Sequence, residues 1–434
     1  MQQVNVGIVG LGTVGLGTLT VLSENAEQIA TKLGFSLRVK AVCSRTVETK
    51  PIPAGLGPVQ KTNDWRAVVA NPDVDVVVEV IGGTHVAREV VEAAIQAGKS
   101  VVTANKELMA ECGADIWDRA IGQGVNLGME ASVAGGIPIL GVLREGIAGD
   151  RVNALFGILN GTCNYILTEI ERHNTPFDTV LMEAQRLGFA EADPAMDVDG
   201  FDAASKLAIL AALAFGERIM PSDIHTEGIR RVLPIDFQYA HQMEYTIRLI
   251  AAARLTPAGL ILSVRPSLIA NRAILAGVRG AYNAVWVRGQ FGEDTFYYGR
   301  GAGSQPTGVA VVSDLMRVAR EIRSGSPQRV SPFAHERLGE YEPIPITRLK
   351  SRYYLRFRVE DRPGIIARLA TVLANKGISI DAVLQLPEEN WRDLPFVITT
   401  QPTMEESLRA ALAEMGTHDY LIEAPFAMPM EAKL

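Results

Sequence analysis

The sequence predicts an α/β protein that starts with a parallel sheet wound with helices and ends with a small α+β module. Strand and helix signals alternate through residues 3–105, which is typical of parallel strands joined by right-handed crossovers. In the tail, residues 353–428, the signals follow the order β-α-β-β-α-β. The part between them is mixed, and 434 residues are enough for roughly two to four domains.

The N-terminal sheet is predicted from apolar runs separated by helical patterns. The run "VDVVVEVI" (74–81) is β-branched and continuous, as expected for a strand covered on both faces. The amphipathic segment "HVAREVVEAAIQAG" closes on Gly98, a common residue at a helix end. In chain order, we expect a strand at 4–10, a helix at 13–30, strands at 36–43 and 74–81, a helix at 85–98 and a strand at 100–105.

The middle and the tail carry the remaining signals. Residues 324–352 mix Pro, Ser, Gly and charge in a way that is typical of a linker. In the middle, we expect helices at 137–147, 162–173, 177–187 and 202–215, strands at 151–160, 259–269 and 283–290, and a glycine turn leading into a helix at 301–322. In the tail, we expect strands at 353–360, 378–386, 395–400 and 419–427 and helices at 363–376 and 404–415.

Composition argues against two classes of partner. A net charge of -7 disfavours nucleic acid, which requires a basic face. The longest apolar helical run, residues 207–215, is too short to cross a bilayer, so no membrane partner is expected. Three widely spaced cysteines, and an N-terminus without a signal-peptide pattern, predict a reducing and cytoplasmic location.

A glycine-rich turn, "GLGTVG", follows the first predicted strand and opens the first predicted helix. In the G-x-G-x-x-G pattern, the glycines allow a tight turn, a close approach of backbone to pyrophosphate, and close packing of helix on strand. The pyrophosphate would lie on the free N–H groups of the helix start. We therefore predict a Rossmann-type domain, and the alternative is a glycine turn without ligand. The predicted cofactor-binding residues here are Gly10, Leu11, Gly12, Thr13, Val14 and Gly15.

The second predicted strand is followed by Ser44 and Arg45. A site that prefers NAD usually carries Asp or Glu there, which accepts a hydrogen bond from the ribose 2′-hydroxyl. Arg45 is suited to bind a 2′-phosphate, so we favour NADP as the cofactor, with NAD possible. The alternative is that Arg45 stacks on adenine or faces solvent.

Five carboxylates crowd the stretch "GFAEADPAMDVDGFDAASKL" (188–207), at Glu191, Asp193, Asp197, Asp199 and Asp202. A calcium loop is excluded, because the position of its final bidentate Glu falls on Lys206. The helix that follows is apolar almost all round, so we expect it to be buried. Asp202 and Lys206, four residues apart, share one face of it. They form either a structural ion pair or part of an active site with a positioned proton donor.

Lys106 and the turn at Asn160 are two further candidates. Lys106 follows a strand at the carboxyl edge of the parallel sheet, where ligands bind, and the alternative is a surface lysine at a helix start. Asn160, Gly161 and Thr162 lead from a strand into a helix, whose free N–H groups can take a substrate carboxylate. The alternative there is plain N-capping by Thr162 or Asn160.

In combination, these segments resemble homoserine dehydrogenases. The resemblance rests on "GIVGLGTVG", "VVTANKE", "EASVAGGIPI", "GILNGTCNYIL", "GFAEADPAMDVDGFDAASKLAIL" and "GRGAGSQPT", in this order. The tail "VEDRPGIIARLATVLANKGISI" resembles an ACT domain, a small amino-acid-sensing module with a ferredoxin-like fold. The resemblance implies NAD(P)H-dependent interconversion of L-aspartate 4-semialdehyde and L-homoserine, a step in threonine, methionine and isoleucine biosynthesis.

The resemblance also implies residue roles. Lys206 is the proton donor, Asp202 lies beside it in the substrate site, and Glu191 binds the substrate amino group. Lys106 lies at the cofactor and substrate. The remaining implied positions are Gly161 and Thr162 for substrate, Gly188 and Gly303 for the cofactor or substrate pocket, and Glu130 with the carbonyls of Val133, Gly135 and Ile137 for a sodium ion. For Glu130, the alternative is a glycine turn with a structural Glu.

One position departs from the family pattern. Phe189 stands where some members carry Tyr, so any hydrogen bond from that hydroxyl is absent here. The expected layout is a Rossmann domain at 1–136 with the helix 304–323 returning to it, a catalytic and dimerisation domain at 137–303, a linker at 324–352 and an ACT domain at 353–430.

The tail is expected to sense an amino acid. Pro363 would start a helix whose N-terminus could take an amino-acid carboxylate. ACT domains generally pair side by side, so the resemblance implies a homodimer or homotetramer with L-threonine as inhibitor. The alternative is a dimerising domain that binds no ligand.

Two rival interpretations remain. A hydroxyacid dehydrogenase with an ACT tail, such as phosphoglycerate dehydrogenase, would use a catalytic His near the end of its catalytic part. No matching setting surrounds the six histidines, His85, His173, His225, His241, His335 and His418. The other rival is a catalytically silent amino-acid sensor that keeps NADP for structure. A silent sensor would not need the polar residues of an active site. This chain has four of them, Lys106, Glu191, Asp202 and Lys206, which argues against this interpretation.

Overall fold

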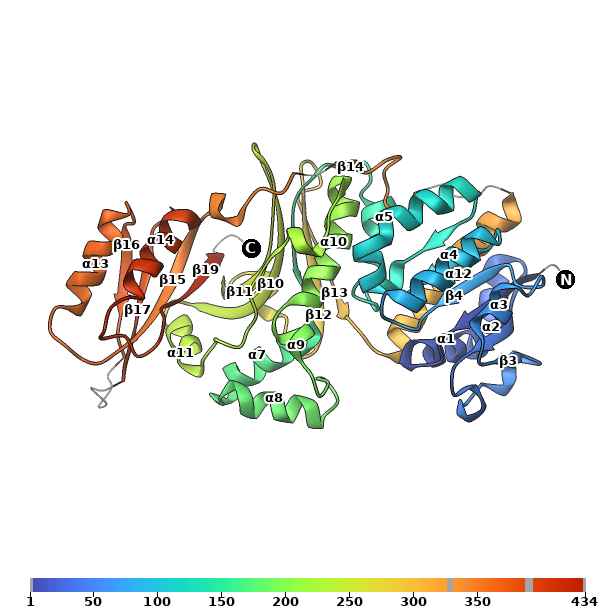
Figure 1. Cartoon of the computed structure of the whole chain (residues 1–434), viewed down its shortest axis with the longest axis horizontal. Coiled ribbons are helices and arrows are strands. Elements are labelled where there is room, and N and C mark those ends of the chain that lie inside the picture. The colour runs from blue at the N-terminus through green and yellow to red at the C-terminus, as the bar shows by residue number, and fades with distance from the viewer. Residues whose placement is uncertain (1–2, 326–330, 341, 387–392, 432–434) are drawn as a thin grey trace. The chain divides into compact units, whose positions relative to one another are not determined.

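The computed structural model describes residues 3–325, 331–340, 342–386 and 393–431. The chain divides into two compact units, each assembled from three segments (Figure 1). The first unit comprises residues 1–155, 205–222 and 283–341, and the second comprises residues 156–204, 223–282 and 342–434. Among the helices that the structure describes, none has the length and apolar character needed to span a membrane.

A six-stranded parallel sheet forms the centre of the first unit, with the order β3-β2-β1-β4-β5-β6. Its strands are β1 (Gln3–Val9), β2 (Ser36–Cys43), β3 (Gln60–Thr62), β4 (Val76–Glu79), β5 (Ser100–Thr103) and β6 (Leu127–Gly128). The strand order reverses between β1 and β4, and open α/β sheets bind ligands at such a point. The predicted Rossmann-type sheet is confirmed.

Helices α1 and α12 of the first unit are in close contact through glycines. A Cβ atom on Gly308 would lie only 2.7 Å from the carbonyl carbon of Gly17, so larger residues would push the helices apart. The Ser304 hydroxyl donates to the Thr13 carbonyl over 2.8 Å. The helices of this sheet are α1 (Thr13–Glu24), α2 (Ala26–Leu33), α3 (Trp65–Val69), α4 (His85–Gln96), α5 (Lys106–Gln123) and α12 (Ser304–Ser324).

The second unit is built on strands in the order β10-β11-β19-β15-β17-β16. Strand β19 pairs in parallel with β11 and antiparallel with β15, so it joins the hairpin of the middle segment to the strands of the tail. The strands are β10 (Tyr245–Thr256), β11 (Gly259–Ala270), β15 (Lys350–Val359), β16 (Ile380–Leu384), β17 (Leu394–Thr400) and β19 (Phe426–Glu431), with the short β9 (His225–Thr226) and β18 (Thr403–Met404) beside them.

Helices of the second unit pack on this sheet. The tail helices α13 and α14 contribute Leu369, Leu373 and Leu408 to a core shared with β15 and β17 (Figure 1). The observed order of tail elements confirms the predicted β-α-β-β-α-β module. The helices are α7 (Gly161–His173), α8 (Phe177–Arg186), α9 (Ala195–Val198), α11 (Pro234–Gln242), α13 (Ile365–Asn375) and α14 (Glu405–Met415).

Some elements have residues in both units. These include β7 (Val152–Ile158), α10 (Phe201–Phe215) and, by its first residue, β12 (Tyr282–Gly289). The other elements of the first unit are α6 (Ile139–Gly141), β8 (Glu217–Arg218), β13 (Asp294–Arg300) and β14 (Gly339–Glu340). Strand β14 and a 3₁₀ turn at Ile346–Arg348 lie within the stretch expected to be a linker; its residues 326–330 and 341 lie outside the described residues.

Two helix predictions are wrong in detail. The helix expected at 13–30 is two helices, because the backbone of Asn25 leaves the helical region with φ -101° and ψ 13°. At 137–147, only Ile139–Gly141 is α-helical, and Val142–Gly146 forms a wider π-helical turn. Such π-helical turns are rare and often occur near functional sites.

Two predictions in the tail are also wrong. Pro363 does not begin a helix; α13 starts at Ile365, after Gly364, whose φ of 89° an L side chain would strain. Of the strand expected at 419–427, only residues 426–427 belong to a strand; the rest is turn, bend and irregular chain, with a single bridge from Leu421 to Val359. The carbonyls of Ala424 and Pro425 accept from Arg231 instead of a neighbouring strand.

Candidate functional site

The glycine-rich turn between β1 and α1 has the features of a phosphate-binding loop. A Cβ atom on Gly15 would lie 2.0 Å from the Gly10 carbonyl oxygen, and one on Gly10 would lie 2.5 Å from the Val80 carbonyl oxygen. Both positions therefore require glycine for packing. A Cβ atom on Gly12 would meet no atom within 4 Å, and no side chain caps the helix that Gly12 begins. The uncapped start of α1 and the open space beside Gly12 suit an anion.

A cavity of about 710 Å³ adjoins this turn in the first unit. The carboxyl ends of β1, β2 and β4 contribute to its lining, together with the loop from Ile81 to Val86. Arg45 and Lys50 line the same cavity on the β2 side, and Trp65 adds an aromatic ring. The predicted residues Gly10, Leu11, Gly12 and Arg45 therefore surround one cavity.

Glu79, which the sequence analysis missed, holds the loop on the β4 side of this cavity. Its carboxylate accepts from the Ile81 backbone N–H over 2.7 Å and from the Thr103 hydroxyl over 2.7 Å. Burial raises the pKa of this carboxyl above its usual value, although these hydrogen bonds oppose the rise. The Asn105 side chain donates to the Gly83 carbonyl over 2.6 Å. The signal in the sequence that could have identified Glu79 is a carboxylate within an otherwise apolar predicted strand.

Lys106 is the first residue of α5, directly after Asn105, whose side chain caps the helix by accepting from the Leu108 N–H. It is partly exposed. Its position at a helix start is thus observed, and its role toward a cofactor stays a prediction. Gly303 precedes α12 with φ 132°, a conformation that favours glycine.

A second group of predicted residues lies in the second unit around the start of α7. Asn160 caps this helix by accepting from the Cys163 N–H over 2.7 Å. Its amide nitrogen donates to Asp202 over 2.8 Å and to Asp197 over 2.7 Å. Asn160 rather than Thr162 is therefore the cap, and it also fixes the Asp202 carboxylate.

The segment after α8 lies beside the same helix start. The Thr162 hydroxyl donates to the Phe189 carbonyl over 2.7 Å, which brings the turn at Gly188 next to Gly161. Gly188 adopts φ 77°, and Glu191 is exposed with its backbone carbonyl bonded to Gln185. The structure thus groups Gly161, Thr162, Gly188 and Asp202 on two neighbouring turns.

The two ionisable residues of α10 are buried: Asp202 is 2% exposed and Lys206 is 9% exposed. They are four residues apart on one helix, and therefore on one face. Asp199 pairs with Arg230 at 2.6 Å, so it serves as a structural ion pair. Asp193 accepts from the Ala195 N–H, as expected for a local cap.

Glu130 is buried in the first unit at a strained turn. Its two carboxylate oxygens accept from the backbone N–H groups of Leu140 and Gly141 over 2.9 and 2.7 Å. Burial, together with the nearby carboxylate of Asp314, raises the pKa of Glu130 to about 7. Ala134, between the predicted ligands Val133 and Gly135, has φ 48°, which is unusual for a residue with a Cβ atom.

The sodium site that the resemblance implies would use one carboxylate, Glu130, and three backbone carbonyls. Within the described residues, no cluster of three or more His, Cys, Asp or Glu could hold a metal ion. A single buried carboxylate with backbone carbonyls suits a hard cation instead. A positive charge beside Glu130 would offset the burial that raises its pKa.

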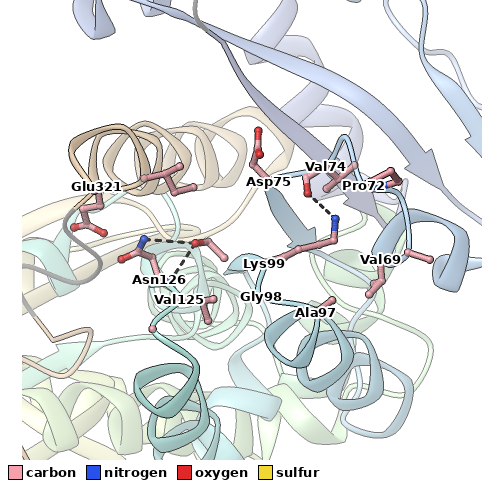
Figure 2. A pocket seen from close by; sticks show the side chains of 15 residues that line it. Val69, Pro72, Val74, Asp75, Ala97, Gly98, Lys99, Val125, Asn126 and Glu321 are labelled. Carbon is pink, nitrogen blue, oxygen red and sulfur yellow. Dashed lines mark hydrogen bonds between the residues drawn. The ribbon is translucent and has the colours of Figure 1, made fainter.

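A further cavity, of about 590 Å³, lies at the amino ends of β4 and β5 (Figure 2). Lys99 is buried there and donates to the carbonyls of Asn71 and Val74 over 2.6 Å each. Burial lowers the pKa of this lysine. None of the predicted site residues lines this cavity, and its lysine is already satisfied by backbone.

Comparisons with known proteins cover almost the whole chain. A family model described as homoserine dehydrogenase matches residues 138–316, its NAD binding domain matches residues 10–130, and an ACT domain matches residues 353–416. Homoserine dehydrogenase of Pseudomonas aeruginosa is 43% identical over 418 residues, covering 96% of each chain.

Solved structures agree. A homoserine dehydrogenase from Thiobacillus denitrificans superposes with a TM-score of 0.91 at 42% identity, covering 99% of both chains. A hyperthermophilic archaeal homoserine dehydrogenase in complex with NADPH has a TM-score of 0.62 at 26% identity, covering 73% of this chain and 98% of that one. A dinucleotide-binding turn, a buried Asp and Lys on one helix, and relatives of this coverage lead to one conclusion: the chain belongs to the homoserine dehydrogenase family.

Proposed function

We propose that the chain interconverts L-aspartate 4-semialdehyde and L-homoserine with NADP(H), in threonine, methionine and isoleucine biosynthesis. The observation that carries this proposal is the buried pair on α10, in which Asn160 fixes Asp202 and Lys206 is 9% exposed. A catalytically silent sensor is not favoured, because the relatives that cover the chain are named as enzymes.

In the direction of reduction, a nicotinamide cofactor held at the glycine-rich turn would supply the hydride that the aldehyde carbon of the substrate accepts. Negative charge then develops on the aldehyde oxygen. The Lys206 ammonium donates its proton to that oxygen, which completes the alcohol, and the reverse reaction returns the proton to Lys206. Asp202 keeps the ammonium oriented.

The turns around α7 would bind the substrate. The free N–H groups at Gly161 and Thr162 suit the substrate carboxylate, because a helix start attracts anions. The exposed Glu191 carboxylate suits the substrate ammonium. Lys106 serves the cofactor and substrate at the carboxyl edge of the parallel sheet.

NADP is the proposed cofactor. Arg45 and Lys50 both line the cavity beside the glycine-rich turn, so two positive charges are available for a 2′-phosphate. The dinucleotide itself would lie along Gly10 to Gly15. The archaeal relative that binds NADPH supports this choice, and NAD is the alternative.

Sodium and L-threonine are the proposed small ligands besides substrate. Glu130 with the carbonyls of Val133, Gly135 and Ile137 would hold the sodium ion. The ACT module would sense L-threonine, as a homodimer or homotetramer in which these modules pair. The domain limits expected from the sequence, with the ACT domain at 353–430, remain part of this proposal.

The test is the rate of NADP⁺ and NAD⁺ reduction with L-homoserine, with and without L-threonine. We expect turnover, with higher kcat/KM for NADP⁺, and suppression by L-threonine. Absence of turnover with either cofactor would contradict the proposed reaction. A clear preference for NAD⁺ would contradict the role of Arg45, and turnover untouched by L-threonine would contradict the sensing role alone.

A further inference from the structure

A cavity of about 440 Å³ in the second unit lies between the tail module and the hairpin β10-β11. Helix α14 and strands β15 and β19 of the tail form one side of it, and β11 with the loop 227–231 forms the other. It contains none of the residues assigned above to substrate, cofactor or sodium.

Arg265 lines this cavity and has one donor group that is not used. The side chain belongs to β11 and is 3% exposed. Its Nη1 donates to the Glu405 carboxylate over 2.9 Å. Its Nη2 is buried and, within the described residues, has no hydrogen-bond partner. Since a buried donor without a partner is destabilising, this geometry suits a site whose occupant supplies an acceptor.

Glu405 does not supply that acceptor, because its three hydrogen bonds go to other donors. Besides Arg265, it accepts from the Tyr353 hydroxyl and from Arg409 at 2.9 Å. Burial would raise the pKa of Glu405, but the charge of Arg265 and these hydrogen bonds outweigh it and hold the pKa below its usual value. Glu405 is therefore ionised, and Nη2 still lacks an acceptor.

The charges around the cavity favour an anion. Four arginines line it against three carboxylates, so one positive charge is in excess; these are Arg230, Arg231, Arg265 and Arg409 against Asp199, Glu227 and Glu405. Burial and the neighbouring charge of Arg356 lower the pKa of Arg231. An anion near Arg231 would offset both effects.

We infer that this cavity binds a small oxyanion, a carboxylate in preference to a phosphate, through Arg265 Nη2 with support from Arg231 and Arg409. A planar guanidinium edge matches the two oxygens of a carboxylate. The three lining carboxylates repel the larger negative charge of a phosphate more strongly than that of a carboxylate. The occupant would connect the tail module to the hairpin across a site that neither forms alone.

Binding there would also affect α10, the helix that carries Asp202 and Lys206. A Cβ atom on Gly228, a lining residue, would lie 2.4 Å from the Val198 carbonyl oxygen, so the cavity wall is in tight contact with the end of α9. The Ile229 N–H donates to the same carbonyl over 2.8 Å. Asp202 follows four residues after Val198. A change at the wall therefore has a short path to the proposed active site.

The binding test uses the full chain titrated with sodium acetate and, separately, with sodium phosphate at constant ionic strength and constant sodium concentration, followed by calorimetry. We expect saturable acetate binding, weaker phosphate binding, and at least a tenfold loss of acetate affinity in Arg265→Met. Met keeps the volume, and Glu405 keeps Tyr353 and Arg409 as partners. The matched control is Arg254→Met, which removes a cation of β10 that pairs with Glu431 outside the cavity, and should bind acetate like the parent.

Arg409→Gln is a second test in case Arg265→Met does not fold. It should fold normally, because Arg409 is 42% exposed and its loss leaves the Arg265–Glu405 pair intact. It should weaken acetate binding severalfold. Unchanged acetate affinity in both Arg265→Met and Arg409→Gln, or no saturable binding of acetate by the parent, would overturn the site. Stronger binding of phosphate than acetate would overturn the carboxylate preference. Because binding is measured directly, these outcomes do not depend on the proposed reaction.

Discussion

Asp202 and Lys206 illustrate how single buried charges define the candidate site. An ionised side chain loses its hydration when it is buried, so each needs a partner within the fold. Asp202 finds one in the Asn160 amide, which also caps α7. Such fully engaged polar groups are held in one orientation, and catalysis by proton transfer depends on that orientation.

Replacing Lys206 with Met should lower kcat by about 10²- to 10⁴-fold, the range typical of a lost general acid. NADP⁺ affinity, measured by fluorescence titration, should change little. Lys99→Met is the matched control, since Lys99 is also a buried lysine but bonds only to backbone at the amino end of the sheet. A Lys206→Met enzyme with near-normal kcat would remove this residue from the mechanism.

The glycines of the phosphate-binding turn should separate into two classes. Gly15→Ala forces a Cβ atom to within 2.0 Å of the Gly10 carbonyl oxygen, so we expect a loss of about 1–3 kcal/mol in unfolding free energy. Gly12→Ala meets no protein atom within 4 Å and should unfold like the parent while binding NADP⁺ at least tenfold more weakly. Denaturant unfolding and NADP⁺ titration of both variants check this. Equal cofactor binding by Gly12→Ala and parent would contradict it.

Glu130 should make stability depend on pH and sodium together. Its pKa is about 7 in the folded chain against 4.5 for an ordinary Glu, so the folded state binds more protons between these values. Without sodium, stability should therefore fall as pH rises from about 4.5 to 7, and sodium should restore it above pH 7. Thermal unfolding in sodium or choline chloride measures both effects, and both should vanish in Glu130→Gln. An equal response to the two salts at pH 8 would count against the cation site.

Among the elements, α7 joins structural and chemical roles at its first turn. Asn160 accepts from the Cys163 N–H, as an N-cap does, and donates to Asp202 and Asp197. The Asn160 side-chain oxygen caps the helix, and its side-chain nitrogen donates to the two carboxylates. Because these functions belong to different atoms, a substitution can remove one and keep the other.

Asn160→Asp should keep the cap and lose the donor. A carboxylate caps a helix as well as an amide does, so α7 itself should be preserved. It would, however, place a third negative charge beside Asp197 and Asp202 and should lower kcat/KM for L-homoserine at least tenfold. Asn160→Ala, which loses both functions, should in addition lose about 0.5–2 kcal/mol of unfolding free energy. Similar kcat/KM for Asn160→Asp and the parent would show that the donor is dispensable.

Elements with a strong local signal were predictable from the sequence. Strand β2 has the predicted bounds 36–43 because its apolar residues alternate with Arg38 and Lys40 before the apolar end at 41–43, a pattern typical of a strand. Strand β10 gave no such signal, since "IRLIAAARLT" contains alanines and Arg248, which is fully buried and paired with Glu171 at 3.0 Å. That partner is remote in sequence, so no local pattern could reveal it.

The same limit applies to the candidate site. The glycine spacing and the Asp202–Lys206 interval are local, and the sequence was sufficient to propose them. Glu79 bonds to Thr103, and Arg265 bonds to Glu405, between elements that only the fold brings together. The sequence therefore predicts residues whose chemistry is set within a few positions and misses those whose partner lies on another element.

For the whole molecule, the second unit shows that the tail is integrated with the middle segment. Asp236 of α11 and Arg356 of β15 form a fully buried ion pair, and the Tyr354 hydroxyl donates to the same carboxylate over 2.6 Å. Breaking a buried pair by removing one charge usually destabilises by about 3–5 kcal/mol. The middle and the tail should consequently unfold together.

Asp236→Asn tests this cooperativity. We expect a loss of about 3–5 kcal/mol and a single unfolding transition seen equally by probes in the middle and the tail. Asp419→Asn is the matched control, because it breaks an exposed Asp–Arg pair with Arg362 and should change stability by less than about 1 kcal/mol. Adding Arg356→Met to Asp236→Asn should recover part of the loss. Two separate transitions in the parent would contradict a shared fold.

The position of β19 has a consequence for biosynthesis. A ribosome makes β11 long before it makes β19, yet β19 lies between β11 and β15 in the finished sheet. A nascent chain therefore carries one open strand edge of the hairpin throughout the synthesis of the tail, and such an edge readily pairs with other chains. Gly259–Ala270 is the segment that a chaperone would need to shield until residues 426–431 emerge.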